Sequence, residues 1–292
     1  MILALLRAVR PRQWVKNVFV GAPVLFAHKL TDGKAAERAA CAVAIFCLLS
    51  SAVYLWNDLV DVEKDRAHPK KRARPIASGA LPVPVARMAA IGFAMAGLGC
   101  AFALDRWFAV AAGGYLVLNV AYSLALKKVA YLDVLVIAAG FLLRVIAGAL
   151  AVRVVASPWL LVCTGLLASF LGFGKRAHEL ATSGERGAEQ RAALSAYRLS
   201  RLRFALWITG ISTVAAYFLY TVAEHTRTFF HTERMVWTAP CIAVGITRYL
   251  FFVGSRGKTE SPTEEMLRDP LFMLNLVVYA ALVVGIIYAS RA

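Results

Sequence analysis

Long apolar runs recur along the whole 292-residue chain, and they restrict the fold more than any other feature of the sequence. Each run has about 17–22 residues, the length that a helix needs to cross the hydrocarbon core of a bilayer. The runs cover residues 14–30, 37–56, 83–104, 107–126, 131–151, 157–174, 202–222, 234–253 and 270–289. Because lipid satisfies no backbone hydrogen bonds, such runs predict helices. We therefore expect an all-α polytopic membrane protein with about nine transmembrane helices in one bundle.

The distribution of basic residues indicates how these helices cross the membrane. The chain has 33 Lys and Arg residues, 17 Asp and Glu residues and a net charge of +16. In a soluble protein that charge would suggest nucleic acid, but 60% of this chain is hydrophobic. Of the 33 basic residues, 24 lie in the N-terminal segment or the even-numbered loops, if the adjoining ends of the predicted spans are included. Cytosolic loops of membrane proteins carry such an excess of basic residues, and anionic lipid headgroups attract it. We therefore expect these segments to lie in the cytosol, and we expect membrane lipid as a partner and no nucleic acid.

Carboxylates gather in the loop between the second and third predicted spans. Asp58, Asp61 and Asp65 are spaced i, i+3, i+7, which places all three on one face of a helix, and Asn57 precedes them. Clustered carboxylates repel one another unless a cation shares them, and their hard oxygen atoms suit Mg²⁺, which proteins commonly share with substrate phosphates. The spacing therefore predicts that Asn57, Asp58, Asp61 and Asp65 hold Mg²⁺ on a diphosphate, with the three aspartates as candidate catalytic residues.

Basic side chains follow the carboxylates directly and could hold further phosphate oxygens. They are Arg66, His68, Lys70, Lys71, Arg72 and Arg74. A solvated, mixed-charge cytosolic loop is the alternative interpretation. The acidic-then-basic order, the helical spacing and the position at a membrane mouth favour a metal–diphosphate site beside an anion site.

Two cytosolic loops are long enough to cap the bundle. The first covers residues 57–82. The second, 175–201, alternates apolar and charged residues around a Gly-Ser break, which predicts a helix-turn-helix at the membrane surface. About four spans separate the loops, which suggests two similar halves. We expect both loops to lie over a polar cavity of one transmembrane domain, residues 1–292.

An arginine lies near the middle of the fifth predicted span. Arg144 follows Asp133 by eleven residues, so both lie on nearly the same helix face. An ionisable residue at bilayer depth usually faces a polar cavity or a charged partner. Arg144 therefore indicates either a polar cavity that opens to the cytosol or a structural ion pair with Asp133.

Several residues at span ends are weaker candidates. Tyr122 and Lys127 could contact a phosphate or simply anchor the helix at the interface. Lys16 and Asn17 could point into the same cavity as Arg144, or Lys16 could snorkel from an interfacial belt. Further candidates lie near the two ends of the second long loop, where the general excess of cytosolic charge also explains basic residues: Lys175, Arg176 and Tyr197.

Several motifs resemble a known family. The pattern N-D-x-x-D-x-x-x-D at 57–65 resembles the UbiA superfamily of intramembrane prenyltransferases, and H-P-x-K-R-x-R-P-I-A-S-G at 68–79 is similar to its first conserved loop. Five further stretches are similar to the branch that transfers phosphoribose to decaprenyl phosphate. They are R-P-R-Q-W-V-K-N at 10–17, Y-x-x-x-L-K at 122–127, the Asp and Arg of 133–144, G-K-R-x-x-E-L at 174–180 and S-x-Y at 195–197.

The resemblance implies a Mg²⁺-dependent transfer of 5-phosphoribose from phosphoribosyl diphosphate to a polyprenyl phosphate, a step toward lipid-linked arabinose for cell-wall polysaccharide. It implies a bacterial inner membrane and an active site that faces the cytosol. The basic run would contact the diphosphate or the ribose 5-phosphate, and a second set would position the lipid phosphate. That second set is Lys127, Arg144, Lys175 and Arg176.

One departure from the superfamily bears on the substrate. Aromatic prenyltransferases of this superfamily generally have a second acidic motif with two aspartates, whereas the matching region here has only Asp133, preceded by Lys127 and Lys128. Two alternatives stay open: a UbiA-type enzyme that moves a prenyl group from its diphosphate to an aromatic or haem acceptor, and a secondary transporter or lipid-binding protein. The sequence is also compatible with a homo-oligomer.

Overall fold

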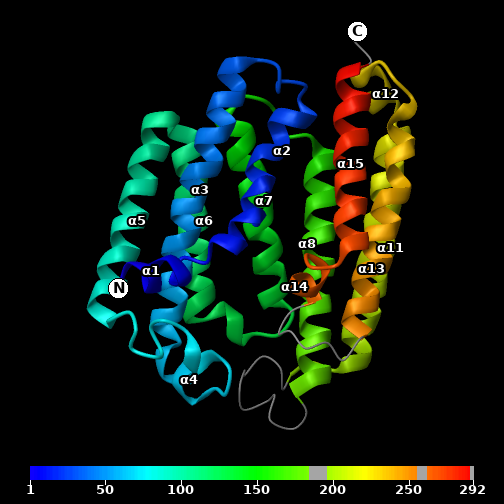
Figure 1. The fold of residues 1–292 in the computed structure, drawn as a ribbon. Helices are drawn as coiled ribbons and strands as arrows, with labels where there is room; N and C mark the ends of the chain where they lie inside the picture. The colour runs from blue at the N-terminus through cyan, green and yellow to red at the C-terminus, as the bar shows by residue number, and fades with distance from the viewer. Residues whose placement is uncertain (184–195, 255–261, 290–292) are drawn as a thin grey trace. The chain divides into compact units, whose positions relative to one another are not determined.

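The computed structural model describes residues 1–183, 196–254 and 262–289, and it divides the chain into two compact units, Met1–Ala156 and Ser157–Ala292 (Figure 1). The first unit contains α1 (Ile2–Ala8), α2 (Val18–Phe26), α3 (Gly33–Val60), α4 (Val62–Ala67), α5 (Val83–Leu104), α6 (Arg106–Leu124) and α7 (Leu132–Ala151). It also has the short 3₁₀ helices η1 (Pro11–Asn17), η2 (Lys71–Ala73) and η3 (Leu126–Lys128). The second unit contains α8 (Pro158–Ser183), α11 (Leu199–Val222), α12 (Glu224–Phe230), η5 (Arg234–Thr238), α13 (Ala239–Gly254), α14 (Pro262–Met266) and α15 (Pro270–Ala289).

Eight helical stretches in the described ranges are long and apolar enough to cross a membrane. They are α3, α5, α6 and α7 in the first unit, and α8, α11, the stretch 234–254 and α15 in the second. The all-helical membrane fold is thus confirmed, and the unit boundary leaves four candidate spans on each side. Similarity between the two halves stays a prediction.

The expected count of nine spans is not confirmed, because the first predicted span is not one long helix. Residues 14–30 form most of η1 and the nine-residue α2, which contains Pro23. Nine helical residues extend only about 14 Å, whereas the hydrocarbon core is about 30 Å thick. The polar residues that interrupt this run, Lys16 and Asn17, lie in η1, before α2 begins.

The centre of the first unit is α3, which packs against α6 and α7. The buried ring of Phe46 lies 5.9 Å from that of Phe108 and 5.2 Å from that of Tyr115. On α7, a Cβ atom at Gly148 would lie 2.0 Å from the carbonyl oxygen of Val20 on α2. The two backbones can approach this closely only because position 148 has no side chain.

Polar side chains join the helix ends near the start of α3. Arg38 donates to the carbonyl oxygens of Leu104 (3.1 Å) and Ala151 (2.6 Å), in the last residues of α5 and α7. Asp105 caps α6 by accepting from the backbone N–H of Trp107 at 2.9 Å and of Phe108 at 3.3 Å. These contacts satisfy terminal backbone groups near the start of α3, whereas the carboxylate cluster lies at the opposite end of this helix.

In the second unit, Arg248 on α13 forms two hydrogen bonds with Asp269, at 2.9 and 2.6 Å, just before α15. Tyr249 donates to the carbonyl oxygen of Leu171 at 2.8 Å, which ties α13 to α8. Helix α8 runs past the predicted end of its span, residue 174, to Ser183. The turn and second helix predicted within 175–201 lie mostly in 184–195, outside the described residues.

Candidate active site

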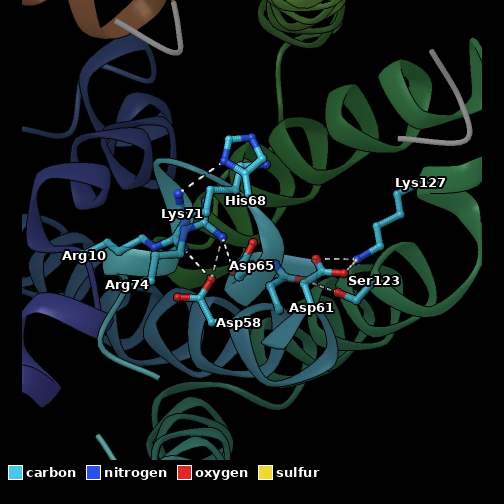
Figure 2. Close-up of polar contacts among 10 residues, drawn as sticks. Arg10, Asp58, Asp61, Asp65, His68, Lys71, Arg74, Ser123 and Lys127 are labelled. Carbon is cyan, nitrogen blue, oxygen red and sulfur yellow. Dashed lines mark hydrogen bonds and ion pairs between the residues drawn. The ribbon is translucent and has the colours of Figure 1, made fainter. Parts of the chain in front are cut away.

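The predicted carboxylates lie where α3 passes into α4 (Figure 2). Asp61 separates the two helices, with φ −97° and ψ 7°. The backbone N–H of Asp61 donates to Asn57 O at 3.0 Å, and that of Asp65 donates to Asp61 O at 2.8 Å. Because these bonds continue the i→i−4 pattern, the interruption of the helix leaves the carboxylates close to their helical positions.

Asp58 and Asp65 share one guanidinium group. Arg74 donates from Nη1 to Asp58 Oδ1 at 3.2 Å and to Asp65 Oδ2 at 2.7 Å. Both carboxylates are only 3% exposed, so their charges need partners of this kind. The structure thus brings together three residues that the sequence singled out, and it assigns Arg74 a contact with both carboxylates.

A second guanidinium group reaches Asp58 from the N-terminal segment. Arg10 donates to Asp58 Oδ1 at 2.5 Å and lies 5.6 Å from the ring centre of Tyr54. The backbone of Arg10 has φ 53° and ψ 63°, a left-handed conformation that is unfavourable for residues other than glycine. Arg10 also precedes Pro11, which further restricts its backbone. Such strain is common at functional sites, and here it accompanies a side chain that contacts the carboxylate cluster.

Asp61 is paired with a different cation. Lys127, in η3, donates to both Asp61 oxygens at 2.7 Å each. Beside this pair, the Ser123 hydroxyl donates to Asn57 Oδ1. The three carboxylates therefore do not share a single partner: Figure 2 shows Asp58 and Asp65 near Arg74, and Asp61 near Lys127.

Arg144 lies in a second polar cluster. It donates to Asn17 Oδ1 at 3.1 Å, to Gly140 O at 3.1 Å and to the Tyr115 hydroxyl at 2.8 Å, and it lies 4.6 Å from the Tyr115 ring centre. Its partners in the described chain include no carboxylate. The ion pair with Asp133 is not formed, because eleven residues of helix separate the two residues by about 16 Å. Arg144 is 6% exposed, so its charge is buried among neutral groups.

Helix α3 connects the two clusters. Asn17, which accepts from Arg144, donates to Cys47 Sγ at 3.3 Å and to Ser50 Oγ at 3.2 Å. Ser50 and Asp58 are eight residues apart on α3, which corresponds to about 12 Å along the helix axis. A buried cation thus lies below the carboxylate cluster, as expected from the sequence, and Asn17 lies beside it.

The donor atoms at the carboxylate cluster suit a hard divalent cation. Asp58 Oδ2 is buried and has no hydrogen-bond partner among the described residues, so it is available as a ligand. Ionised carboxylates and an amide oxygen are ligands that Mg²⁺ accepts. In the described residues, however, no three carboxylate, His or Cys side chains already converge on one point. The residue types fit the metal, and Arg10, Arg74 and Lys127 occupy most of the oxygen atoms that would hold it.

The other predicted residues of the first unit differ in their exposure and in their contacts. Arg66 is exposed and pairs with Glu63 at 2.8 Å. His68 Nδ1 accepts from the backbone N–H of Lys70 (3.2 Å) and of Lys71 (3.3 Å), so it shapes the loop. Arg72 is exposed, Lys16, Lys71 and Tyr122 are half-buried, and Asp133 is fully buried. Substrate contacts of these residues stay predictions.

The remaining predicted residues belong to the second unit. Lys175 and Arg176 lie within α8, where Arg176 is buried and pairs with Glu179. Tyr197 is buried just before α11. Their participation in the site stays a prediction.

Three residues of the two clusters were not among the predicted site residues. Arg10 begins the 10–17 motif, and that position was its only signal. Tyr115 precedes Tyr122 by seven residues, which places both on one face of α6. Ser123 directly follows Tyr122 and could not be distinguished from an ordinary helix serine. Each makes its contact with a residue at least 29 positions away, so local spacing could not identify it.

Comparison with known proteins places the chain in a family. The model of the UbiA prenyltransferase family matches residues 18–253. The decaprenyl-phosphate phosphoribosyltransferase of Mycolicibacterium smegmatis is 33% identical over 99% of this chain and 94% of that protein. The protein of the same name from Corynebacterium glutamicum is 31% identical over 97% of this chain and 86% of that protein.

Solved structures agree on the fold. A UbiA homolog from Archaeoglobus fulgidus bound to DMAPP and Mg²⁺ superposes with a TM-score of 0.73, at 19% identity over 97% of this chain and 98% of that chain. The same homolog bound to Cd²⁺ gives a TM-score of 0.69, at 18% identity over 99% of this chain and 100% of that chain. The family match, the full-length relatives and the shared fold lead to one conclusion: this chain is an integral membrane protein of the UbiA prenyltransferase family.

Proposed function

We propose that this protein transfers 5-phosphoribose from phosphoribosyl diphosphate to a polyprenyl phosphate of the decaprenyl phosphate type. The products are polyprenyl-phosphoryl ribose 5-phosphate and diphosphate. The observation that carries the proposal is the buried Arg144, which has no carboxylate partner among the described residues. It lies below a carboxylate cluster that is paired with three other cations. Such a site suits two anionic substrates, and the full-length relatives carry the name of this activity.

The carboxylate cluster would bind the leaving diphosphate. Asn57, Asp58, Asp61 and Asp65 would hold Mg²⁺, which neutralises the charge that develops on the departing diphosphate. Arg74 would contact phosphate oxygens once its carboxylate partners hold the metal. The loop that follows would contribute further cations to the diphosphate or the ribose 5-phosphate: Arg66, His68, Lys71 and Arg72.

The cluster around Arg144 would position the lipid phosphate. An oxygen of that phosphate forms the new bond to C1 of the ribose, and the C1–oxygen bond to diphosphate breaks with its electron pair. A phosphate is already ionised, so the site needs no strong general base. In-line attack inverts the configuration at C1. Arg144 offers a planar guanidinium group that suits phosphate oxygens, and Tyr115 and Asn17 hold its orientation.

The acidic residues disfavour transfer of a prenyl group to an aromatic or haem acceptor. A second acidic motif would help to hold a prenyl diphosphate, but the segment that joins α6 and α7 supplies only Asp133 after Lys127 and Lys128. Lys127 extends to Asp61 rather than adding a carboxylate to the site. Cations at this position suit a second phosphate substrate better than a second shared metal.

A direct assay tests the proposal. Purified full-length protein in lipid nanodiscs is given Mg²⁺, labelled phosphoribosyl diphosphate and decaprenyl phosphate, and mass spectrometry identifies the lipid product. A parallel reaction contains a prenyl diphosphate and an aromatic acceptor. We expect phosphoribosyl lipid only in the first reaction and none after EDTA. Prenylated acceptor in the second, with no product in the first, would contradict the proposal.

The orientation of the site in the membrane is part of the proposal. From the excess of basic residues we infer that the N-terminal segment and the loop of the carboxylate cluster lie on the cytosolic side of the membrane, which we propose is a bacterial inner membrane. Phosphoribosyl diphosphate would then enter from water, while the lipid phosphate would enter from the bilayer. A single 1–292 domain and a homo-oligomer stay predictions.

A further inference from the structure

Lys127 occupies the carboxylate of Asp61 in a way that excludes a metal from the same oxygens. Its ammonium nitrogen lies 2.7 Å from both Asp61 Oδ1 and Asp61 Oδ2. The side chains of Lys127 and Asp61 are 15% and 28% exposed, so the contact is largely shielded from water. An ammonium group and a divalent cation compete for the same carboxylate lone pairs.

The position of Lys127 allows this contact to open. Lys127 lies in η3, a three-residue turn between α6 and α7, and its four-carbon side chain is flexible. The neighbouring Lys128 is exposed and has no ion pair in the described chain. Two lysines on the same turn thus differ in one respect, the contact with Asp61.

We propose that Lys127 is an exchangeable counter-ion, which neutralises Asp61 when no metal is bound and gives way when a divalent cation binds together with an anionic substrate. The inference rests on the proposed function. If Lys127 left Asp61 without a new partner, a mostly buried ammonium group would lose its counter-charge, which is unfavourable. A substrate phosphate supplies a new partner. Metal and phosphate therefore bind cooperatively, because each removes the cost that the other would face alone.

Arg74 provides a second exchange of the same kind. It holds Asp58 and Asp65 together at 3.2 and 2.7 Å, and Asp58 Oδ2 stays without a partner. If those carboxylates held a metal, the guanidinium group would be free to contact a phosphate oxygen. Lys127 is the better residue to test, because Arg74 links two acidic residues and its loss would also disturb the fold of the loop.

The experiment measures metal binding without turnover. Purified full-length wild type, Lys127→Met and the control Lys128→Met are titrated with Mn²⁺ in the absence of phosphates, and free Mn²⁺ is measured by electron paramagnetic resonance. We expect Lys127→Met to bind Mn²⁺ roughly 5- to 150-fold more tightly than wild type, the usual range of such couplings. Lys128→Met removes the same charge from the same turn and should change the affinity much less. In the double variant Lys127→Met/Asp61→Asn the gain should disappear.

A second measurement should show the opposite effect of the same variant, a loss of affinity for phosphoribosyl diphosphate. At saturating Mn²⁺, Lys127→Met should bind labelled phosphoribosyl diphosphate at least about 10-fold more weakly, because a charge-assisted hydrogen bond is lost. Unchanged Mn²⁺ affinity in Lys127→Met, an equal gain in Lys128→Met, or weaker metal binding together with a lower melting temperature would each overturn the inference. If wild type fails to bind phosphoribosyl diphosphate while Lys127→Met still gains Mn²⁺ affinity, the proposed function is wrong and the counter-ion role of Lys127 survives.

Discussion

Replacement of Arg144 by Met separates a substrate-binding role from a structural one. The side chain makes three hydrogen bonds, all to neutral groups, so the change strands the Asn17 and Tyr115 oxygens. Each stranded buried polar group costs about 1–3 kcal/mol. The same change removes a buried charge that no carboxylate of the described residues neutralises, which relieves a desolvation penalty of several kcal/mol. Because the two effects oppose each other, we expect the variant to fold with a melting temperature close to that of wild type.

The catalytic effect should be much larger. Loss of a charge-assisted hydrogen bond to the lipid phosphate would cost about 1.5–3 kcal/mol, which is about 10- to 100-fold in kcat/KM. Initial rates are measured with decaprenyl phosphate varied at saturating phosphoribosyl diphosphate, and then with the substrates exchanged. We expect the loss in kcat/KM for the lipid and little change in the KM for phosphoribosyl diphosphate. Arg144→Lys should recover only part of the activity, because a single ammonium group cannot form two parallel bonds.

Two results would refute this reasoning. A stable Arg144→Met variant with normal kinetics for both substrates would show that Arg144 contacts neither phosphate. A variant whose activity toward both substrates falls in proportion to its folded fraction would show that Arg144 only supports Asn17 and Tyr115. Thermal unfolding followed by circular dichroism distinguishes these results.

Three further predictions test other parts of the structure. Asp61→Asn should lower turnover roughly 10²–10³-fold without loss of helical circular dichroism, and full activity would exclude the metal assignment. Gly148→Ala should destabilise the protein by about 1–3 kcal/mol, because the new Cβ would lie 2.0 Å from a carbonyl oxygen of α2. The control is Gly113→Ala, whose Cβ would have no neighbour within 4 Å, and equal melting temperatures of the two variants would contradict the packing. In a background without native cysteines, Glu63→Cys should react with a membrane-impermeant thiol reagent only from the cytosol and Thr31→Cys only from outside; the reverse pattern would overturn the orientation.

The sequence predicted the features that depend on local periodicity. Long apolar runs gave the membrane helices, because length and composition alone decide whether a segment can cross a bilayer. The spacing of Asp58, Asp61 and Asp65 predicted a carboxylate cluster, and the helical hydrogen bonds do continue across Asp61. The first span was the exception. Its length matched a transmembrane helix, but residues 11–17 form a 3₁₀ helix and only nine residues follow in α2.

The pairing of charges could not be predicted in the same way. Arg10 and Asp58 are 48 residues apart, Lys127 and Asp61 are 66 apart, and Arg144 and Asn17 are 127 apart. Which cation meets which carboxylate depends on how helices pack, and periodicity contains no information about that. For the same reason the sequence left an Arg144–Asp133 ion pair open, although the rise of one helix already separates them by about 16 Å.

The arrangement of charges bears on how two anions could meet in one site. Two unit charges 4 Å apart repel by about 4 kcal/mol at an effective dielectric constant of 20, and each proposed substrate carries more than one charge. At the water-facing end of α3, Arg10, Arg74 and Lys127 are each paired with a carboxylate, so these three cations are not free to bind a phosphate. Arg144 lies on α7, and its partner Asn17 contacts α3 at Ser50, about 12 Å along that helix from Asp58. In the described chain Arg144 has no carboxylate partner, so it would attract a phosphate before any metal binds. This difference predicts an order of events: the lipid phosphate can bind first, while Arg10, Arg74 and Lys127 become available only when the metal and the diphosphate arrive together.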